Sequence, residues 1–320
     1  MVPIITGPEK LPGRSTEEIV YQRLAVWLLG SALFLVSCAT TQGPDGLTAG
    51  ELPKPKVALV LGGGAARGFA HIGVIRALEQ EKIPIDLVVG TSVGSLIGAL
   101  YAHDRNSFEL EWTAFALEKD DIFDYGLLNA FTGMGVAKGE KLEAFINNKV
   151  PVANIEGLKI PFAAVATDLN RGSRVVLDTG PVGRAVRASS AIPGVFQPVE
   201  HQGKLLVDGG LIDNVPVSVA RDKGADIVIA VDIGKQVSNF NIADIIDVML
   251  QSITIMNAEN AKIRKREADI LIAPTIGDVG MLDFTQKKRC MQAGIEATQK
   301  MLPEIKAKIS AWGRDKLERN

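Results

Sequence analysis

Ser92 has the setting of a nucleophilic serine. It stands at the centre of a G-x-S-x-G pattern (residues 90–94), which follows an apolar run at 85–89 and precedes a helical stretch at 95–100. A sharp strand-to-helix turn pushes a serine hydroxyl out of the backbone, and flanking glycines remove side chains that would clash there. The turn also aims backbone N–H groups and the positive end of the helix at an anion forming beside the serine. The pattern predicts a serine suited to acyl transfer, although G-x-S-x-G alone is a weak signal.

A glycine-rich loop at 62–68 follows a second apolar run, 57–61, and opens a helical stretch at 69–81. Consecutive glycines leave backbone N–H groups uncovered, and a loop that opens a helix points them at an anion. A nucleotide phosphate fits this loop poorly, because the dinucleotide fingerprint needs a third glycine where Arg67 stands and a P-loop needs Gly-Lys-Ser/Thr. We therefore favour an oxyanion hole for a tetrahedral acyl intermediate over a phosphate cradle or a turn without a ligand.

Asp208 ends a short apolar strand and is followed by Gly209 and Gly210. A carboxylate at the end of a strand, beside glycines that let another segment approach, is well placed to accept the proton of a serine. Taken alone, Asp-Gly-Gly is more often an ordinary turn.

These three motifs occur in the order found in the patatin-like phospholipase family, which the chain resembles from about residue 56 to 275. Further matches are G-F-A-H-I-G-V at 68–74, A-T-D-L at 166–169, S-S-A-I-P-G at 189–194 and D-N-V-P at 213–216. The resemblance implies a serine lipid acyl hydrolase in which Ser92 is the nucleophile and Asp208 the base of a catalytic dyad. Phospholipids or lysophospholipids are the implied substrates. A transacylase with the same dyad and a non-catalytic lipid-binding protein of the same fold are the alternatives.

The resemblance also implies a role for the glycine-rich loop. The backbone of Gly63, Gly64 and Ala65 would form the oxyanion hole, and Arg67 would steady the loop. Many family members carry glycine where Ala65 stands, but a backbone donor survives that change.

A histidine triad is the other arrangement that the residues permit. Ser92, Asp168 and His201 follow the chain order nucleophile, acid, histidine of α/β-hydrolases. However, His201 lies in a polar, hairpin-like turn before the strand of Asp208. We expect His71 to be a packed structural residue and His103 to lie at the surface, so the Ser–Asp dyad is the preferred hypothesis.

Alternating strand and helix patterns predict an α/β fold with a largely parallel sheet covered on both faces. The resemblance implies a three-layer α/β/α patatin-like domain at 56–320. Beyond the motifs, strands are expected at 160–167, 174–177, 205–208, 225–232 and 269–273, and helices at 139–147, 182–190, 217–223, 243–267 and 284–312.

Two apolar segments could contact lipid. Residues 122–134 are aromatic and punctuated by glycine, which is compatible with a lid or with a buried connector. Residues 242–256 carry Ile, Val and Met at helical spacing, which more often indicates a core helix.

The composition and net charge of the chain limit the ligands that it is expected to bind. The 320 residues are 47% hydrophobic and carry a formal net charge of −2, which gives no signal for nucleic-acid binding. We expect no metal and no cofactor, because the sequence shows no clustered His and Cys ligands. The composition does not specify an oligomeric state.

The N-terminal segment predicts a bacterial lipoprotein. Arg23 precedes the apolar residues 24–36, which are too few to span a bilayer but suit a signal-peptide core. The sequence L-V-S-C ending at Cys38 resembles a lipobox, so we expect a signal peptide at 1–37, lipid attachment at Cys38 and a flexible tether at 38–55. A plain secretory signal, or a short anchor with an incidental cysteine, is the alternative.

Two details qualify this expectation. Glu9, Glu17 and Glu18 are unusual before a signal-peptide core and indicate a translation start downstream of Met1. Ala39 rather than Asp follows Cys38, which favours the outer membrane, facing the periplasm, over the inner membrane. Cys290 would have no disulfide partner once Cys38 is lipidated.

Overall fold

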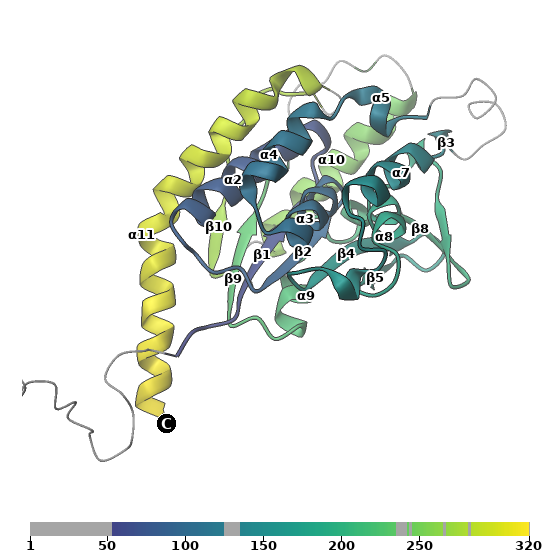
Figure 1. Cartoon of the computed structure of the whole chain (residues 1–320). Coiled ribbons are helices and arrows are strands. Elements are labelled where there is room, and N and C mark those ends of the chain that lie inside the picture. Colours follow the sequence, from purple (N-terminus) through teal and green to yellow (C-terminus); the bar gives the residue numbers. More distant parts are fainter. Residues whose placement is uncertain are drawn as a thin grey trace, which may run out of the picture. The chain divides into compact units, whose positions relative to one another are not determined.

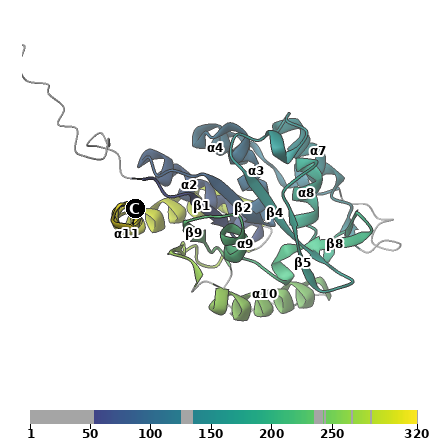
Figure 2. The ribbon, with the colours of Figure 1, turned by 90° about the horizontal axis from the view of Figure 1, so that it is seen from below.

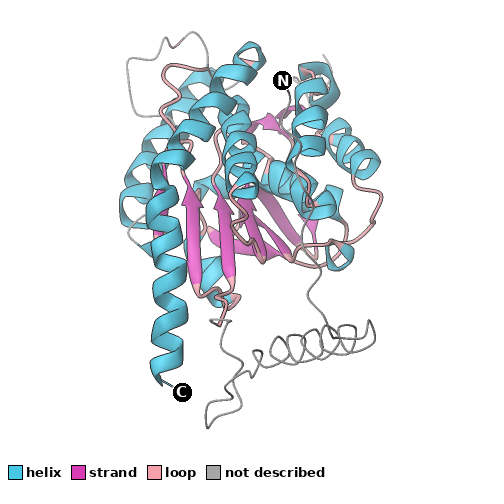
Figure 3. Ribbon diagram, turned by 60° about the vertical axis from the view of Figure 1, so that its left-hand side comes forward, coloured by secondary structure: helices cyan, strands magenta, loops and turns pink. Residues whose placement is uncertain are grey.

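Within the residues that the computed structural model describes (53–124, 135–234, 242, 245–264, 267–280 and 283–319), eight strands form one sheet. Their order is β10 (Ile270–Ile272), β9 (Ile227–Val231), β1 (Val57–Leu61), β2 (Leu87–Thr91), β4 (Phe162–Asp168), β8 (Lys204–Asp208) and β7 (Val199–His201), and β5 (Ser173–Leu177) also pairs with β4. The strands from β10 to β4 are parallel, whereas β5, β7 and β8 join in antiparallel pairs. The sheet is therefore mostly parallel, as the sequence predicts (Figure 3).

Helices cover both faces of this sheet (Figures 1 and 2). The helices are α2 (Phe69–Gln80), α3 (Val93–Asp104), α4 (Ser107–Ala116), α5 (Lys119–Ile122), α7 (Glu140–Lys149), α8 (Val182–Ser189), α9 (Val217–Asp222), α10 (Ile245–Arg264) and α11 (Lys287–Arg319). Short 3-10 turns lie at η1 (Ala65–Gly68), η2 (Ile155–Gly157), η3 (Gly209–Leu211) and η5 (Phe284–Gln286), and β3 (Gly135–Ala137) pairs with β6 (Gly194–Phe196).

Strand β1 shows why the parallel strands appear in the sequence as continuous apolar runs. Its odd-numbered residues belong to the large core that includes side chains of α2, α3, α8 and α11. Its even-numbered residues belong to a second core on the opposite face, with side chains of α9. Because both faces are buried, no polar position interrupts the run.

Strand β4 brings the ends of β2 and β8 together. Residues 162–165 of β4 pair with β2, and residues 166–168 pair with β8. Strand β5 pairs with residues 164–168, which overlaps both, so β2 and β8 share the other edge of β4. Because β2 runs parallel and β8 antiparallel to β4, their carboxyl ends meet, with Thr91 opposite Val165 and Asp208 opposite Ala166.

The predicted elements are present with ends displaced by a few residues, except that α11 runs seven residues beyond its predicted end, from 312 to Arg319. Helices α4 and α5 and strands β3, β6 and β7 were not predicted from the sequence, which indicated only a polar turn around His201 where β7 lies. Helix α10 is a core helix on one face only: Leu250 is buried, but Ile245 and Val248 are 71% and 42% exposed. Of the segment 122–134, Ile122 and Phe123 are buried, and residues 125–134 lie outside the described residues. The predicted signal peptide, Cys38 and most of the tether also lie outside them.

Candidate active site

Ser92 occupies a strained turn between β2 and α3. Its φ of 56° and ψ of −128° lie in a region that residues other than glycine rarely adopt. The flanking glycines are needed because backbone approaches closely: a Cβ on Gly90 would lie 2.4 Å from the Gly94 carbonyl oxygen, and one on Gly94 would lie 2.1 Å from that of Leu61. The expected clash within the turn is thus confirmed for Gly90, whereas Gly94 is needed because β1 approaches the turn.

The amide of Ser92 is held by a neighbouring hydroxyl. It donates to Ser189 Oγ at 2.9 Å, and Ser189 Oγ in turn donates to the carbonyl of Val165 at 2.6 Å. Ser189 is fully buried at the end of α8. The turn therefore presents the side chain of Ser92, while its amide is fixed to the scaffold.

Asp208 lies beside Ser92, as the shared edge of β4 requires. Its amide donates to the Ala191 carbonyl at 2.9 Å, and its Oδ1 accepts the Gly210 amide at 2.7 Å. Burial raises the pKa of Asp208 to about 6, while the Ser92 hydroxyl and the Gly210 amide oppose that shift.

The second carboxylate oxygen of Asp208, Oδ2, is buried, and no described group completes a hydrogen bond to it at standard geometry. Contacts between a catalytic base and its nucleophile are often long before substrate binds. The carboxylate is thus close enough to the Ser92 hydroxyl for that hydroxyl to affect its pKa, and it keeps an oxygen for a proton.

The glycine-rich loop presents fewer amides than the sequence suggests. The Gly63 amide donates to the Asn214 carbonyl at 3.2 Å, which removes Gly63 from the expected oxyanion donors. The amides of Gly64 and Ala65 make no hydrogen bond to any described residue. Ala65, with a φ of 49°, lines the same pocket as Ser92. The candidate oxyanion hole consequently consists of the Gly64 and Ala65 amides.

Hydrogen bonds of three side chains fix this loop. His71 is fully buried, and burial lowers its pKa to about 4, so its neutral ring donates from Nε2 to the Gly62 carbonyl at 2.7 Å. Arg67 donates to the carbonyls of Ile233 at 2.7 Å and Gly277 at 3.1 Å. Asn214 Nδ2 donates to the Gly63 carbonyl at 3.3 Å. The Arg67 guanidinium is thus bonded to the scaffold around the loop, and His71 is a packed residue as expected.

The residues of the alternative triad do not assemble around Ser92. Asp168 lies three residues beyond Val165 on β4, about 10 Å along the strand, and its carboxylate accepts the amides of Asn170 and Arg171. His201 pairs with Lys204, at the opposite end of β8 from Asp208. His103 is half-buried in the last turn of α3 rather than fully at the surface.

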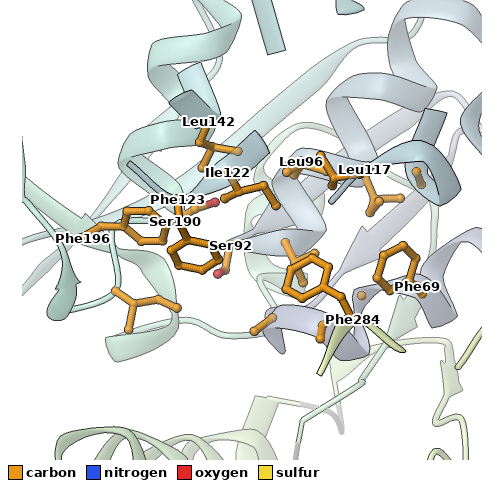
Figure 4. A pocket seen from close by; sticks show the side chains of 17 residues that line it. Phe69, Ser92, Leu96, Leu117, Ile122, Phe123, Leu142, Ser190, Phe196 and Phe284 are labelled. Carbon is orange, nitrogen blue, oxygen red and sulfur yellow. The ribbon is translucent and has the colours of Figure 1, made fainter. Parts of the chain in front are cut away.

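An apolar pocket opens at Ser92 (Figure 4). Ser92 and Ser190 contribute the polar side chains of its lining, and the other lining residues are apolar: Ala65, Ala66, Gly68, Phe69, Val93, Leu96, Ile97, Ala114, Leu117, Ile122, Phe123, Leu142, Ile192, Phe196 and Phe284. Such a lining accommodates a hydrocarbon chain whose reactive end lies at the serine.

The described part of the chain shows no group of three or more His, Cys, Asp or Glu side chains arranged to hold a metal ion. None of the described helices combines the length and apolar content of a membrane-spanning segment.

The sheet places a serine on a strand–turn–helix elbow, with a buried carboxylate and unbonded loop amides beside it. This arrangement is typical of α/β proteins that transfer acyl groups through a serine. The family model described as "Patatin-like phospholipase" matches residues 59–221. The chain belongs to the patatin-like phospholipase family.

Named relatives support this assignment. Patatin-like phospholipase domain-containing protein 6 of Mus musculus is 41% identical over 190 residues, covering 56% of this chain and 14% of the relative. Lysophospholipase NTE1 of Scheffersomyces stipitis is 30% identical over 300 residues, covering 82% of this chain and 18% of the relative. The chain thus spans less than a fifth of the length of these two relatives.

Among solved structures, VipD from Legionella pneumophila is similar, with a TM-score of 0.52 at 15% identity. The match covers 79% of this chain and 67% of VipD. At this identity the likeness shows a shared fold.

Sequence reasoning missed the roles of Ser189 and Asn214. Both lie in segments that matched the family, S-S-A-I-P-G and D-N-V-P, but the match alone did not say what they bond. A buried serine that binds backbone at a long sequence separation leaves no local pattern, because its partners are Ser92 after β2 and Val165 in β4.

Proposed function

We propose that the chain is a serine lipid acyl hydrolase that uses Ser92 and Asp208. The observation that carries this proposal is the apolar pocket that opens at Ser92, beside the buried carboxylate of Asp208. A hydrocarbon chain in this pocket would have its ester carbonyl at the hydroxyl of Ser92.

In the proposed reaction, Ser92 Oγ attacks the ester carbonyl carbon while its proton passes to Asp208. The amides of Gly64 and Ala65 stabilise the oxyanion, a contribution of about 10²–10³ in rate per donor. As the C–O bond to the alcohol breaks, Asp208 returns the proton to the leaving oxygen. Water then attacks the acyl-enzyme, loses a proton to Asp208 and releases the fatty acid, and that proton returns to Ser92.

Phospholipids or lysophospholipids are the proposed substrates. The names of the relatives, a phospholipase domain-containing protein and a lysophospholipase, support this class. The apolar lining supports it too, since it offers a long acyl chain a surface that a small polar ester does not need.

We also propose that Cys38 carries the lipid anchor that its lipobox-like setting suggests, so that the domain works on the inner face of the outer membrane. Two or more acyl chains would give stable attachment, at about 0.8 kcal/mol per buried CH₂ group. Cys38→Ala should leave an unprocessed precursor or a protein released from the membrane. Wild-type protein found in the cytosol with residues 1–37 retained would contradict the anchor.

Covalent labelling tests the catalytic proposal. A fluorophosphonate probe should label the wild-type protein at Ser92, and the purified protein should release fatty acid from lysophosphatidylcholine or phosphatidylcholine vesicles. Ser92→Ala should be folded, unlabelled and inactive. A folded wild-type protein that is neither labelled nor active would overturn the proposal. Adding an alcohol acceptor and analysing the products by mass spectrometry would reveal a transacylase.

A further inference from the structure

Ser190 is the second polar side chain in the pocket lining. The residue is 8% exposed, and its hydroxyl is buried and has no hydrogen-bond partner among the described residues. Its neighbours in the lining include Phe123 and Phe196, which stack with ring centroids 5.0 Å apart (Figure 4). A hydroxyl buried among apolar groups without a partner loses the hydrogen bonds that it makes in water, and a ligand oxygen that bonds to it recovers one of them.

The position of Ser190 limits which part of a substrate can reach it. The residue before it, Ser189, accepts the amide of Ser92, and the residue after it, Ala191, accepts the amide of Asp208, both at 2.9 Å. Ser190 therefore lies between the two chain contacts that fix the dyad. A group at this position meets the atoms next to the scissile ester rather than the far end of an acyl chain.

We propose that the Ser190 hydroxyl recognises an oxygen that lies within a few atoms of the scissile ester, and so selects oxygenated lipid esters over plain alkyl esters. This inference rests on the proposed function and adds a specificity determinant to it. The ester carbonyl oxygen is assigned to the Gly64 and Ala65 amides and the leaving oxygen to Asp208, so Ser190 is left for a further oxygen of the substrate.

Two substrate sources supply this chemistry. On the alcohol side, the further oxygen is the free hydroxyl of a glycerol monoester, such as a monoacylglycerol or lysophospholipid. On the acyl side it is a hydroxyl close to the carbonyl, as in a 3-hydroxyacyl ester. In both, an O–H next to the ester can bond to the Ser190 hydroxyl, which both donates and accepts.

The test compares three esters of equal acyl length under identical detergent conditions: the methyl ester, 1-monoacylglycerol and the methyl ester of the 3-hydroxy acid. The readout is the ratio of kcat/KM for each oxygenated ester to that for the plain methyl ester. One neutral hydrogen bond corresponds to a discrimination of about 3- to 10-fold. Ser190→Ala should reduce at least one of the two ratios by that factor, and the ratio that changes identifies the source of the oxygen.

Matched variants separate recognition from general damage. Ser190→Thr keeps a hydroxyl and should retain the wild-type ratios. Ser189→Ala removes the neighbouring hydroxyl, whose bonds go to Ser92 and Val165, and should lower kcat for all three esters while leaving both ratios unchanged. If Ser190→Ala leaves both ratios at their wild-type values, the inference is wrong although the proposed hydrolase stands. Failure of the wild-type protein on all three esters would instead count against the hydrolase itself.

Discussion

The two strand-to-helix turns of the site, residues 62–68 and 90–94, use the same backbone features for opposite purposes. Both follow a parallel strand, both are rich in glycine, and each holds one non-glycine residue at positive φ, Ala65 at 49° and Ser92 at 56°. In the elbow, Ser189 holds the amide of Ser92, and the side chain is what the turn presents. In the loop, the Arg67 side chain is bonded to the carbonyls of Ile233 and Gly277, the other residues are glycine or alanine, and the Gly64 and Ala65 amides are what the loop presents.

The comparison shows that the neighbours of a strained turn decide which of its groups remain for a ligand. The turns are also packed against each other. A Cβ on Gly94 would lie 2.8 Å from the Gly62 carbonyl oxygen, and one on Gly63 would lie 3.1 Å from the Cβ of Ser92.

The largest effect is expected from the group that the elbow presents and from its base. Ser92→Ala and Asp208→Asn should each lower kcat/KM for lipid esters by at least about 10³-fold, because each removes one half of a single proton-transfer unit. The double variant should be no worse than the worse single variant. Initial rates on short-chain esters and fluorophosphonate labelling measure both effects.

His201→Ala is the matched control for the dyad. It should retain most of the wild-type activity, because His201 lies at the other end of β8 from Asp208. Loss of activity equal to that of Ser92→Ala would restore the histidine triad.

The contact between the turns is tested by Gly94→Ala. The added Cβ would meet backbone of the neighbouring turn, which no side-chain rotation can relieve, so we expect the free energy of unfolding to fall by more than about 3 kcal/mol. Gly280→Ala is the control, since its Cβ would approach no atom of the described residues closer than the Asp283 Cβ at 3.7 Å. Urea denaturation of both variants gives the comparison, and equal stabilities would show that the two turns are not packed as described.

Much of this site follows from sequence because its parts are local. The apolar runs predict the central strands. The glycines of G-x-S-x-G, of the glycine-rich loop and of Asp-Gly-Gly each predict the turn that the motif forms. The alternation of strands and helices predicts the mostly parallel sheet. The steric need for Gly90 could be anticipated because the turn itself imposes it, whereas the need for Gly94 comes from the carbonyl of Leu61 at the end of β1.

The remainder depends on contacts between distant segments. The loss of the Gly63 amide to Asn214 could not be read from the loop, since the acceptor lies 151 residues further along the chain. The exposed face of α10 has the same helical spacing as a core face, so periodicity could not distinguish them. Helix α4 was missed although it carries apolar residues, and two of them, Phe108 and Trp112, are 69% and 72% exposed.

A pH profile sharpens the assignment of the base. Burial raises the pKa of Asp208 to about 6, and only the ionised carboxylate can accept the proton of Ser92. The value of kcat/KM should therefore fall about tenfold per pH unit below about pH 6 and level off above it. A profile that is flat from pH 4.5 to 8 would exclude Asp208 as the base.

The same shift predicts a stability effect of Asp208→Asn. Because the folded state raises this pKa, Asp208 contributes most to stability below its ordinary pKa of 3.8, and this contribution is lost as the pH rises through about 6. At pH 7.5 the buried charge should cost on the order of 3 kcal/mol. Asp208→Asn should therefore raise Tm at pH 7.5, where Asn can still accept the Gly210 amide, and the gain should disappear near pH 4. A lower Tm at pH 7.5 would contradict this account.

The smallest effect is expected from Ala65→Gly, which tests whether the loop acts through its backbone alone. Alanine at a φ of 49° carries a strain of about 1 kcal/mol that glycine relieves, but glycine also raises the entropy of the unfolded chain by a similar amount. Stability should change by less than about 1 kcal/mol, and kcat/KM by less than about 3-fold, because the amide remains. Ala65→Val, a β-branched residue at positive φ, should destabilise the loop and lower kcat. A loss of tenfold or more in Ala65→Gly, measured on the same ester as Ser92→Ala, would show that the Ala65 methyl group contacts the substrate and that the two turns both present side chains.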